Sequence, residues 1–380
     1  MQQAVFGVIG LGHIAQSQHL PNIMRVAHIR LKAICDLDEG KIEDVHGRYP
    51  VPVATKDMAE IFADDEIQAV VVATKEESHV PLTVAALEAG KSVYVEKPLA
   101  ETPEECEQVV AAQQRTGKFV AVGLNRRFAP AYAKAKQVID SHGGAWNIHY
   151  RVSDDYHYSW GRFSPPGVRV IHEVCHIFDV IRWLTGSEVE SVYCAASRAD
   201  DEFIAMKMTN GCVVTIMDSG YATTDVPKER LEVITKRGAV TVEDFVELRT
   251  FGSEEEEPVY RFAGHTHPDC EFSYSPFYEK IGAEALFVMR RTGWKLQQME
   301  SRGELDDVTH TEAKRFYHKG YPGLNYTVNK GWIPAMSHFA ECVLTGSQPM
   351  NAGPEDGLQA SRLAQAAIQS RETGMVVPLS

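Results

Sequence analysis

The spacing of apolar positions changes along this chain and divides it into two regions. From residue 4 to about residue 123, short apolar runs alternate with longer amphipathic segments. This alternation is typical of βαβ units, in which helices connect the strands of a parallel sheet. The strands are expected at residues 4–9, 31–35, 69–73, 92–95 and 119–122. Helices are expected between them, among others at 81–89 and at 103–116, where Thr102 is a cap and Gly117 a stop.

After Pro130 the apolar positions recur at every second residue over several short runs. Such alternation predicts strands with one buried face. They are expected at residues 146–152, 189–197, 203–209, 212–219, 230–235, 239–243 and 246–250. Asn210-Gly211 and Arg237-Gly238 separate consecutive runs and predict tight hairpin turns. With helices expected at 131–140 and from about Val168, this region predicts a large, mostly antiparallel open sheet flanked by helices on one side.

The last part of the chain carries weaker patterns. Residues 252–330 are polar, aromatic and irregular, and they begin with an acidic run that indicates a solvated loop. Two helices are expected after them, at 333–345 and 354–373. The fold class is therefore α/β followed by α+β. The domains are expected at residues 1–123 and 124–350, with a C-terminal helix and tail at 351–380 that packs back toward the first domain.

The composition narrows the class of partner. With 380 residues, of which 44% are hydrophobic and 24% charged, the chain is long enough for two packed domains. Its formal net charge of -14 argues against nucleic acid, which binds clustered lysines and arginines. Seven scattered cysteines without a Cys-x-x-Cys pair predict reduced thiols. Because no signal peptide or membrane-spanning apolar run is visible, we expect a cytoplasmic protein that binds small molecules and no membrane.

A glycine-rich turn follows the first strand and predicts a nucleotide site. Residues 10–15 read Gly-Leu-Gly-His-Ile-Ala and match the G-x-G-x-x-[G/A] pattern. Gly10 allows the tight turn, Gly12 lets the backbone approach a pyrophosphate, and Ala15 keeps the helix close to the strand. Asp36 ends the second strand, where a carboxylate would bind a ribose 2'-hydroxyl and repel a 2'-phosphate. The turn therefore predicts a Rossmann domain that binds NAD rather than NADP.

A second group of motifs lies at later strand ends and on one helix. An apolar run ends in Glu96-Lys97-Pro98, and a lysine placed there beside a nucleotide can polarise an alcohol or accept its proton. Together, four segments resemble the Gfo/Idh/MocA oxidoreductase family over nearly the whole chain. They are the glycine turn, Ala73-Thr74 with His79, Glu96-Lys97-Pro98, and Cys175-His176-Ile177-Phe178-Asp179.

The resemblance implies both an architecture and a chemistry. It implies a Rossmann domain followed by an α/β domain with a large open sheet, which commonly mediates assembly, here as a homodimer or homotetramer. It also implies hydride transfer between a nicotinamide and a sugar, an inositol or a related polyol. Lys97 is then catalytic, the peptide bond before Pro98 is cis, and His176 contacts the reacting hydroxyl. The residues implied at the cofactor are Gly10, Gly12, His13, Ile14, Asp36, Thr74, His79, Glu96, Lys97 and Arg127.

One position departs from the family pattern. Four residues before His176, many members carry an aspartate, whereas this chain has His172. Lys97, His172 and Glu173 all remain candidates for the general base. On a continuous helix from about Val168, the side chains of His172, His176, Asp179 and Trp183 would share one face.

The same segment also matches a zinc motif. Residues 172–176 read His-Glu-Val-Cys-His, and two histidines four residues apart on a helix can bind one metal, with the glutamate as base. No third ligand stands at a recognisable spacing, and the chain begins with a dinucleotide motif. We therefore expect no metal site, and zinc hydrolysis is the least favoured alternative.

An acidic and aromatic cluster precedes this helix and suits a sugar ring. Asp155, Tyr156 and Trp160 are the substrate candidates there, beside Lys97, His172 and His176. Aromatic faces stack on sugar C–H groups and acids accept from hydroxyls, although a packed loop explains the cluster equally well. The predicted function is NAD-dependent oxidation of a secondary alcohol or reduction of a ketone. An NAD-dependent glycosidase and a non-catalytic nucleotide-sensing regulator remain alternatives.

Overall fold

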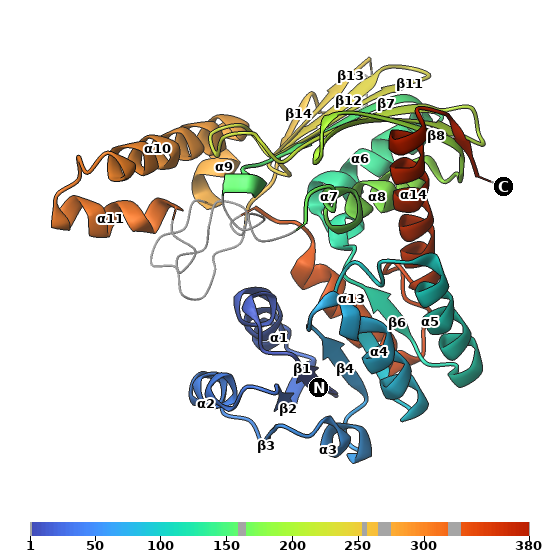
Figure 1. Cartoon of the computed structure of the whole chain (residues 1–380), viewed down its shortest axis with the longest axis vertical. Coiled ribbons are helices and arrows are strands. Elements are labelled where there is room, and N and C mark those ends of the chain that lie inside the picture. Colours follow the sequence, from blue (N-terminus) through green and yellow to red (C-terminus); the bar gives the residue numbers. More distant parts are fainter. Residues whose placement is uncertain (1, 159–164, 253–256, 265–274, 318–327, 380) are drawn as a thin grey trace. The chain divides into compact units, whose positions relative to one another are not determined.

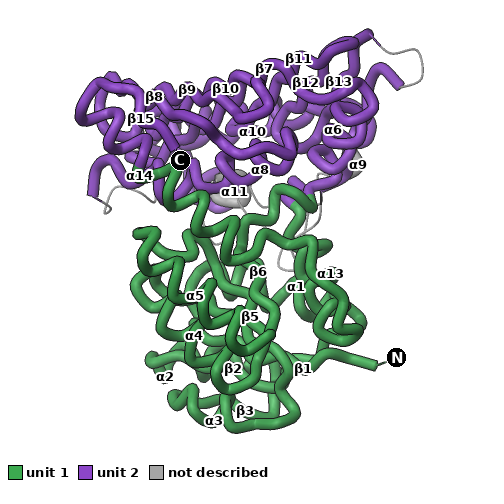
Figure 2. Tube along the Cα trace, turned by 90° about the vertical axis from the view of Figure 1, so that its right-hand side faces the viewer, with its two compact units in different colours: residues 1–128, 331–365 green, residues 129–330, 366–380 purple. Residues whose placement is uncertain are grey.

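The computed structural model describes residues 2–158, 165–252, 257–264, 275–317 and 328–379. The chain forms two compact units, shown in Figure 2. Unit 1 comprises Met1–Phe128 and Gly331–Gln365, and unit 2 comprises Ala129–Lys330 and Ala366–Ser380. These limits differ from the predicted boundaries after residues 123 and 350. Unit 1 is built from two stretches of chain that lie far apart in the sequence.

Unit 1 is organised around a six-stranded sheet in which all neighbouring strands run parallel. The strand order is β3-β2-β1-β4-β5-β6. The strands are β1 (Ala4–Ile9), β2 (Ile29–Cys35), β3 (Val53–Thr55), β4 (Ala69–Val72), β5 (Ser92–Val95) and β6 (Val120–Val122). The predicted parallel sheet is confirmed. Only β3 was not predicted, because an edge strand of three residues, one exposed and two half-buried, is too short to show a pattern.

Helices connect the strands of unit 1. They are α1 (Leu20–Arg25), α2 (Glu39–Arg48), α3 (Met58–Ala63), α4 (His79–Glu88) and α5 (Pro103–Thr116). Helix α13 (Trp332–Thr345) comes from the later stretch of the chain. Helix α5 has the predicted limits: the Thr102 hydroxyl accepts from the Glu105 amide, and Gly117 ends the helix with a φ of 66°. The core of unit 1 includes Phe339 of α13, whose ring packs edge-on against the rings of Phe6 and Tyr94.

Unit 2 contains a nine-stranded sheet with the order β14-β13-β12-β11-β7-β10-β9-β8-β15. Its strands are β7 (Ala145–Ser153), β8 (Val189–Arg198), β9 (Asp201–Met208), β10 (Val213–Ser219), β11 (Glu229–Thr235), β12 (Ala239–Glu243), β13 (Glu247–Phe251), β14 (Val259–Arg261) and β15 (Val377–Pro378). Only the β7–β10 pairing among these is parallel. Helices α6 (Pro130–Ser141) and α8 (Cys175–Thr185) lie on one side of this sheet (Figure 1). The predicted, mostly antiparallel sheet is confirmed.

The segment expected to be irregular, residues 252–330, is largely helical where the structure describes it. Beyond β14 it forms α9 (Ser275–Ile281), α10 (Ala283–Ser301) and α11 (Asp307–Tyr317). The buried positions of α10 recur at helical spacing: they are Ala285, Leu286, Met289, Arg290 and Gly293. The prediction was wrong because an arginine and a glycine stand on this buried face and hide its apolar period. Most of the acidic run lies outside the described residues.

The helix predicted from about Val168 is interrupted. It consists of α7 (Arg169–His172) and α8, with Glu173 and Val174 between them in a turn. Glu173 has φ -118° and ψ -47°, and the amide of Val174 donates to the Arg169 carbonyl, five residues back. The interpretation that His172 and His176 share one continuous helical face is therefore wrong.

None of the helices in the described parts of the chain is long and apolar enough to cross a membrane.

Candidate functional site

The glycine turn has the geometry that a dinucleotide requires. Gly10 has a φ of +92°, and a Cβ atom there would lie 2.5 Å from the Ala73 carbonyl oxygen, so no other residue fits. At Gly12, by contrast, an added Cβ would meet nothing within 4 Å, which leaves open space beside the backbone. His13 and Ile14 then begin the helix, whose next residues, Ala15–His19, form a π-helix before α1. This cradle fits a pyrophosphate.

Asp36 joins the glycine turn to the end of β2. Its Oδ2 accepts from the Leu11 amide at 2.7 Å, and its Oδ1 accepts from the Asp38 amide at 2.9 Å. A carboxylate has about four acceptor positions, so capacity remains for ribose hydroxyls. The half-buried side chain lies at the predicted place, directly after the second strand.

His79 connects two further strand ends. Its buried ring stands with Nδ1 2.7 Å from the Pro98 carbonyl oxygen and Nε2 3.3 Å from that of Thr74. Thr74 follows β4, and Pro98 follows β5. A neutral imidazole carries one N–H and can donate to only one of these carbonyls at a time. His79 thus holds the loops after β4 and β5 together, which accounts for its presence without direct contact to a ligand.

The Glu96-Lys97-Pro98 segment follows β5, and the Lys97–Pro98 peptide bond is cis, which confirms the expectation drawn from the family resemblance. Glu96 is buried, its Oε2 accepts from the Lys97 amide at 3.1 Å, and its Oε1 lies 2.7 Å from Nε2 of His19. Burial alone would raise the pKa of Glu96. The hydrogen bond and charge of His19, with the charge of Lys97, outweigh burial and hold this pKa below its usual value.

Arg127 belongs to the short helix Asn125–Phe128 that follows β6. Its Nη2 lies 2.8 Å from Oδ1 of Asp356, and both side chains are largely buried. Asp356 is in the first turn of α14 (Pro354–Thr373). Within unit 1 the arginine therefore ties the loop after β6 to this helix start, a contact that sequence spacing could not indicate.

Unit 2 holds a buried network of charges around the start of α7. Arg169 is fully buried, with Nη2 2.7 Å from Asp218 and Nη1 2.6 Å from Asp154. Burial opposes its charge, but the two carboxylates outweigh burial and hold the pKa of Arg169 above its usual value. Lys228 lies 2.9 Å from Asp154 and 3.1 Å from Glu173. Its pKa is also raised, because Glu173 and Asp154 outweigh burial.

Three of the predicted site residues of unit 2 lie where α7 and α8 meet, and they differ in burial. Glu173 is buried and ion-paired with Lys228, in the turn between the two helices. His172 ends α7 and is half-buried, whereas His176 lies in the first turn of α8 and is buried. The structure thus brings these three residues to one helix junction.

The aromatic substrate candidates of unit 2 have different positions. Tyr156 is fully buried, and the guanidinium of Arg169 lies 5.3 Å from its ring centroid. This favours the packed-loop interpretation for Tyr156 over contact with a sugar. Asp155 is half-buried. Trp160 lies outside the described residues.

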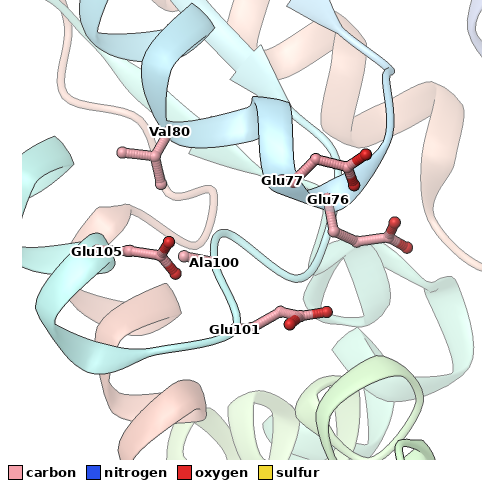
Figure 3. Close-up of a pocket in the computed structure, with 6 residues that line it drawn as sticks. All are labelled: Glu76, Glu77, Val80, Ala100, Glu101 and Glu105. Atoms are coloured by element: carbon pink, nitrogen blue, oxygen red, sulfur yellow. The ribbon is translucent and has the colours of Figure 1, made fainter. Parts of the chain in front are cut away.

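A small hollow of about 150 Å³ opens elsewhere in unit 1 and is lined by carboxylates (Figure 3). Its lining residues are Glu76, Glu77, Val80, Ala100, Glu101 and Glu105. Four acidic side chains repel phosphate, so this hollow does not suit a nucleotide. Within the described ranges, no three His, Cys, Asp or Glu side chains converge in a way that could hold a metal ion.

Dinucleotide-binding oxidoreductases share this arrangement: a parallel sheet, a glycine turn after the first strand and an acidic residue after the second. The profile described as an oxidoreductase family with an NAD-binding Rossmann fold matches residues 5–124, and the Gfo/Idh/MocA C-terminal domain matches residues 132–241. The chain belongs to the Gfo/Idh/MocA oxidoreductase family, and its N-terminal part is an NAD-binding Rossmann domain.

Individual relatives extend over most of the chain. The chain is 26% identical to the uncharacterized oxidoreductase YrbE of Bacillus subtilis, over 100% of its own length and 97% of the relative's. It is 31% identical to inositol 2-dehydrogenase 2 of Saccharopolyspora erythraea, over 64% of this chain and 74% of that one. An Agrobacterium radiobacter oxidoreductase, solved with NAD+, L-tartaric acid and magnesium, superposes with a TM-score of 0.75 at 17% identity and covers 99% and 98% of the two chains. That likeness concerns the fold.

His19 is the residue at this site that the sequence did not reveal. Its partner Glu96 is 77 positions away, so no local spacing joins them. The one available signal was a histidine within the helix that follows the glycine turn, at a position that an apolar helix face would bury.

Proposed function

We propose that the protein is an NAD-dependent dehydrogenase that acts on a secondary alcohol or ketone of a sugar, cyclitol or glycoside. One observation carries the proposal. Lys97 follows the carboxyl end of β5, in the same parallel sheet whose β1 and β2 end in the glycine turn and Asp36. Ligands of such sheets bind at the carboxyl ends of the strands. A lysine there is available to a substrate bound beside the nicotinamide.

The chemistry follows from these positions. Bound NAD supplies a nicotinamide that exchanges a hydride with carbon. In the oxidation direction, Nζ of Lys97 would accept the hydroxyl proton of the substrate while bound NAD would take the hydride from its carbon. A carbonyl group forms. By family resemblance, we assign His176 the orientation of the reacting oxygen and His172 an influence on the same site.

We further propose that Lys97, rather than Glu173, is the general base. Glu173 is ion-paired with buried Lys228, and protonation of the carboxylate would leave that cation with one partner fewer. Breaking a buried ion pair is costly, so a carboxylate held this way is a poor proton acceptor. Its contacts suit a structural role at the junction of α7 and α8.

The relatives indicate where a substrate search begins. Several of them are named inositol 2-dehydrogenases, including two from Saccharopolyspora erythraea, so cyclitols come first. We propose a screen of NADH absorbance over inositols, aldoses, sugar acids and glycosides. Steady NADH formation with one polyol class supports the proposal. Release of free sugar without net NADH would instead favour the glycosidase, and NAD binding without turnover of any compound would favour the nucleotide-sensing regulator.

We also propose that the protein forms a homodimer or homotetramer through the open face of the unit 2 sheet. Phe203 pairs with Met217 across β9 and β10, and both are more than two-fifths exposed. On the same face, beyond the row of Thr215, the exposed side chains of Val213 and Ile234 flank Asn147 of β7, with which both residues pair. Exposed apolar side chains gathered on one sheet face are typical of a protein interface.

A further inference from the structure

A buried hydrogen-bonded pair stands behind the strand end that carries Lys97. His19 is the last residue of the π-helix after the glycine turn, and Glu96 is the first residue after β5. Nε2 of His19 lies 2.7 Å from Oε1 of Glu96, and the two side chains are 4% and 11% exposed. A carboxylate only accepts hydrogen bonds, so Nε2 of His19 carries the proton that they share.

Neighbouring groups fix both members of the pair. The ring of His19 packs against Tyr94, with centroids 5.7 Å apart, and against Trp332, with centroids 6.0 Å apart. The glycine at position 123 leaves room for the carboxylate, since a Cβ atom there would lie 3.1 Å from Oε2 of Glu96. The His19 ring is thus packed against two aromatic rings, and the Glu96 carboxylate lies in the space that a side chain at position 123 would need.

The second oxygen of the same carboxylate reaches the lysine. Oε2 of Glu96 accepts from the backbone amide of Lys97, and the positive charge of Lys97 also acts on this carboxylate. An ionised carboxylate buried without a partner is costly, and it would become protonated or turn toward another donor. His19 therefore keeps the Glu96 carboxylate ionised and oriented so that it accepts the hydrogen bond from the Lys97 amide.

We propose that His19 is a positioning residue of the dehydrogenase, which acts through Glu96 to hold Lys97 in the orientation that proton transfer requires. This inference rests on the proposed function, because it takes Lys97 as the group that accepts the substrate proton. The helix after the glycine turn would then help to position Lys97 in addition to binding the cofactor. A displacement of a catalytic group by about 1 Å can lower the rate by about a hundredfold.

The test compares two replacements of His19 with a matched control. His19→Leu removes the donor, whereas His19→Gln retains an N–H that can reach Glu96. Phe339→Leu is the control, because this buried ring packs on Tyr94 in the same core and makes no polar contact with Glu96. We expect His19→Leu to lower kcat about tenfold or more, with the Kd for NAD within about threefold of wild type. His19→Gln should recover most of the loss, and Phe339→Leu should keep kcat.

A second readout does not depend on activity. In protein labelled with 15N-lysine, the backbone amide resonance of Lys97, assigned with Lys97→Arg, reports its hydrogen bond to Glu96. It should move in His19→Leu, return toward its original position in His19→Gln and stay in Phe339→Leu. If no polyol is turned over by the wild-type protein, the proposed function fails while the resonance still tests the contact. An unmoved Lys97 resonance in His19→Leu, or equal loss of kcat in all three variants, would overturn the inference.

Discussion

Asp36 accepts hydrogen bonds from two backbone amides, those of Leu11 and Asp38, and we propose that its carboxylate discriminates NAD from NADP. Its bond from Leu11 is charge-assisted, and such bonds contribute about 1.5–3 kcal/mol. We expect Asp36→Ala to raise the Kd for NAD about tenfold or more and to lower the ratio of NADP Kd to NAD Kd, because the repulsion of a 2'-phosphate is lost. Isothermal titration with both cofactors measures this.

Asp38→Ala is the matched control for that change. Asp38 also accepts from backbone amides, those of Gly40 and Lys41, but it caps α2. Its loss should reduce the free energy of unfolding by about 1 kcal/mol and leave the cofactor ratio unchanged. The same NADP to NAD ratio in Asp36→Ala as in wild type would contradict the role assigned to Asp36.

The lowered pKa of Glu96 makes the stability of unit 1 depend on pH. In the unfolded chain this carboxyl titrates near its ordinary pKa of 4.5, and in the folded protein its pKa is lower. Its stabilising contribution is therefore complete above about pH 4.5 and is lost as the pH falls through the folded value. In chemical denaturation, the advantage of wild type over Glu96→Gln should shrink below about pH 4.5. A constant difference from neutral to acid pH would refute this.

Buried thiols give a further test at this scale. All six cysteines in the described parts of the chain are free and buried, and burial raises the pKa of Cys35 to about 11 and that of Cys194 to about 12. At about pH 8 these two thiols should react with iodoacetamide only after unfolding, because the thiolate is the reactive form. Peptide mass mapping would show this. Rapid labelling of either cysteine in the native protein would contradict the burial described.

The place of a residue in the site was predictable from the sequence where a local motif determines its backbone conformation. Gly10 and Asp36 stand where the motif places them, because the turn and the strand end determine their backbone. His19 and Tyr156 were not predictable in the same way. Their partners, Glu96 and Arg169, are not near neighbours in the sequence and contact them only in the folded protein.

At the scale of elements, the interruption between α7 and α8 was the main departure from the sequence pattern. Residues 169–185 have a continuous helical period, but Glu173 turns to the cation of Lys228, which comes from a distant part of the chain. Local propensity could not show this, because the decisive partner is a buried charge. Helix α10 shows the converse, since its real helical period was hidden by a buried arginine.

The ion pair at this interruption predicts a large effect on stability. Lys228→Met leaves the carboxylates of Asp154 and Glu173 buried without their shared cation, and such losses cost about 3–5 kcal/mol. Urea unfolding followed by fluorescence should show a lower midpoint, and the added change Glu173→Gln should restore part of it. Lys207→Met, at an exposed pair with Glu190, is the control and should cost at most about 1 kcal/mol. Equal midpoints in the two lysine variants would contradict the account.

At the scale of the whole molecule, both sheets follow from the alternation patterns, whereas the limits of the units do not. The predicted boundary after residue 350 would separate α13 from unit 1. Its residues Met336 and Phe339 nevertheless belong to the core around β1. Apolar spacing shows that a helix has a buried face, but it does not show which core that face enters.

From the exposed apolar residues on the open face of the unit 2 sheet, we expect the protein to self-associate. Phe203→Glu combined with Met217→Glu places two charges in one cross-strand pair on that face, so the oligomer should dissociate in sedimentation velocity. Leu37→Glu is the matched control, because Leu37 is an exposed apolar residue that belongs to unit 1 and not to this sheet. A wild-type protein that is monomeric at all concentrations, or an oligomer unaffected by the paired change, would rule out this interface.

The most direct test of the central claim is the kinetics of Lys97→Met with the polyol identified in the screen. The variant should bind NAD with a Kd within about threefold of wild type, while kcat falls about a hundredfold to ten-thousandfold, as expected when a general base is lost. Lys118→Met, at an exposed lysine of unit 1, should keep full activity. A Lys97→Met enzyme that retained more than about a tenth of the wild-type kcat would contradict the assignment of Lys97 as the proton acceptor.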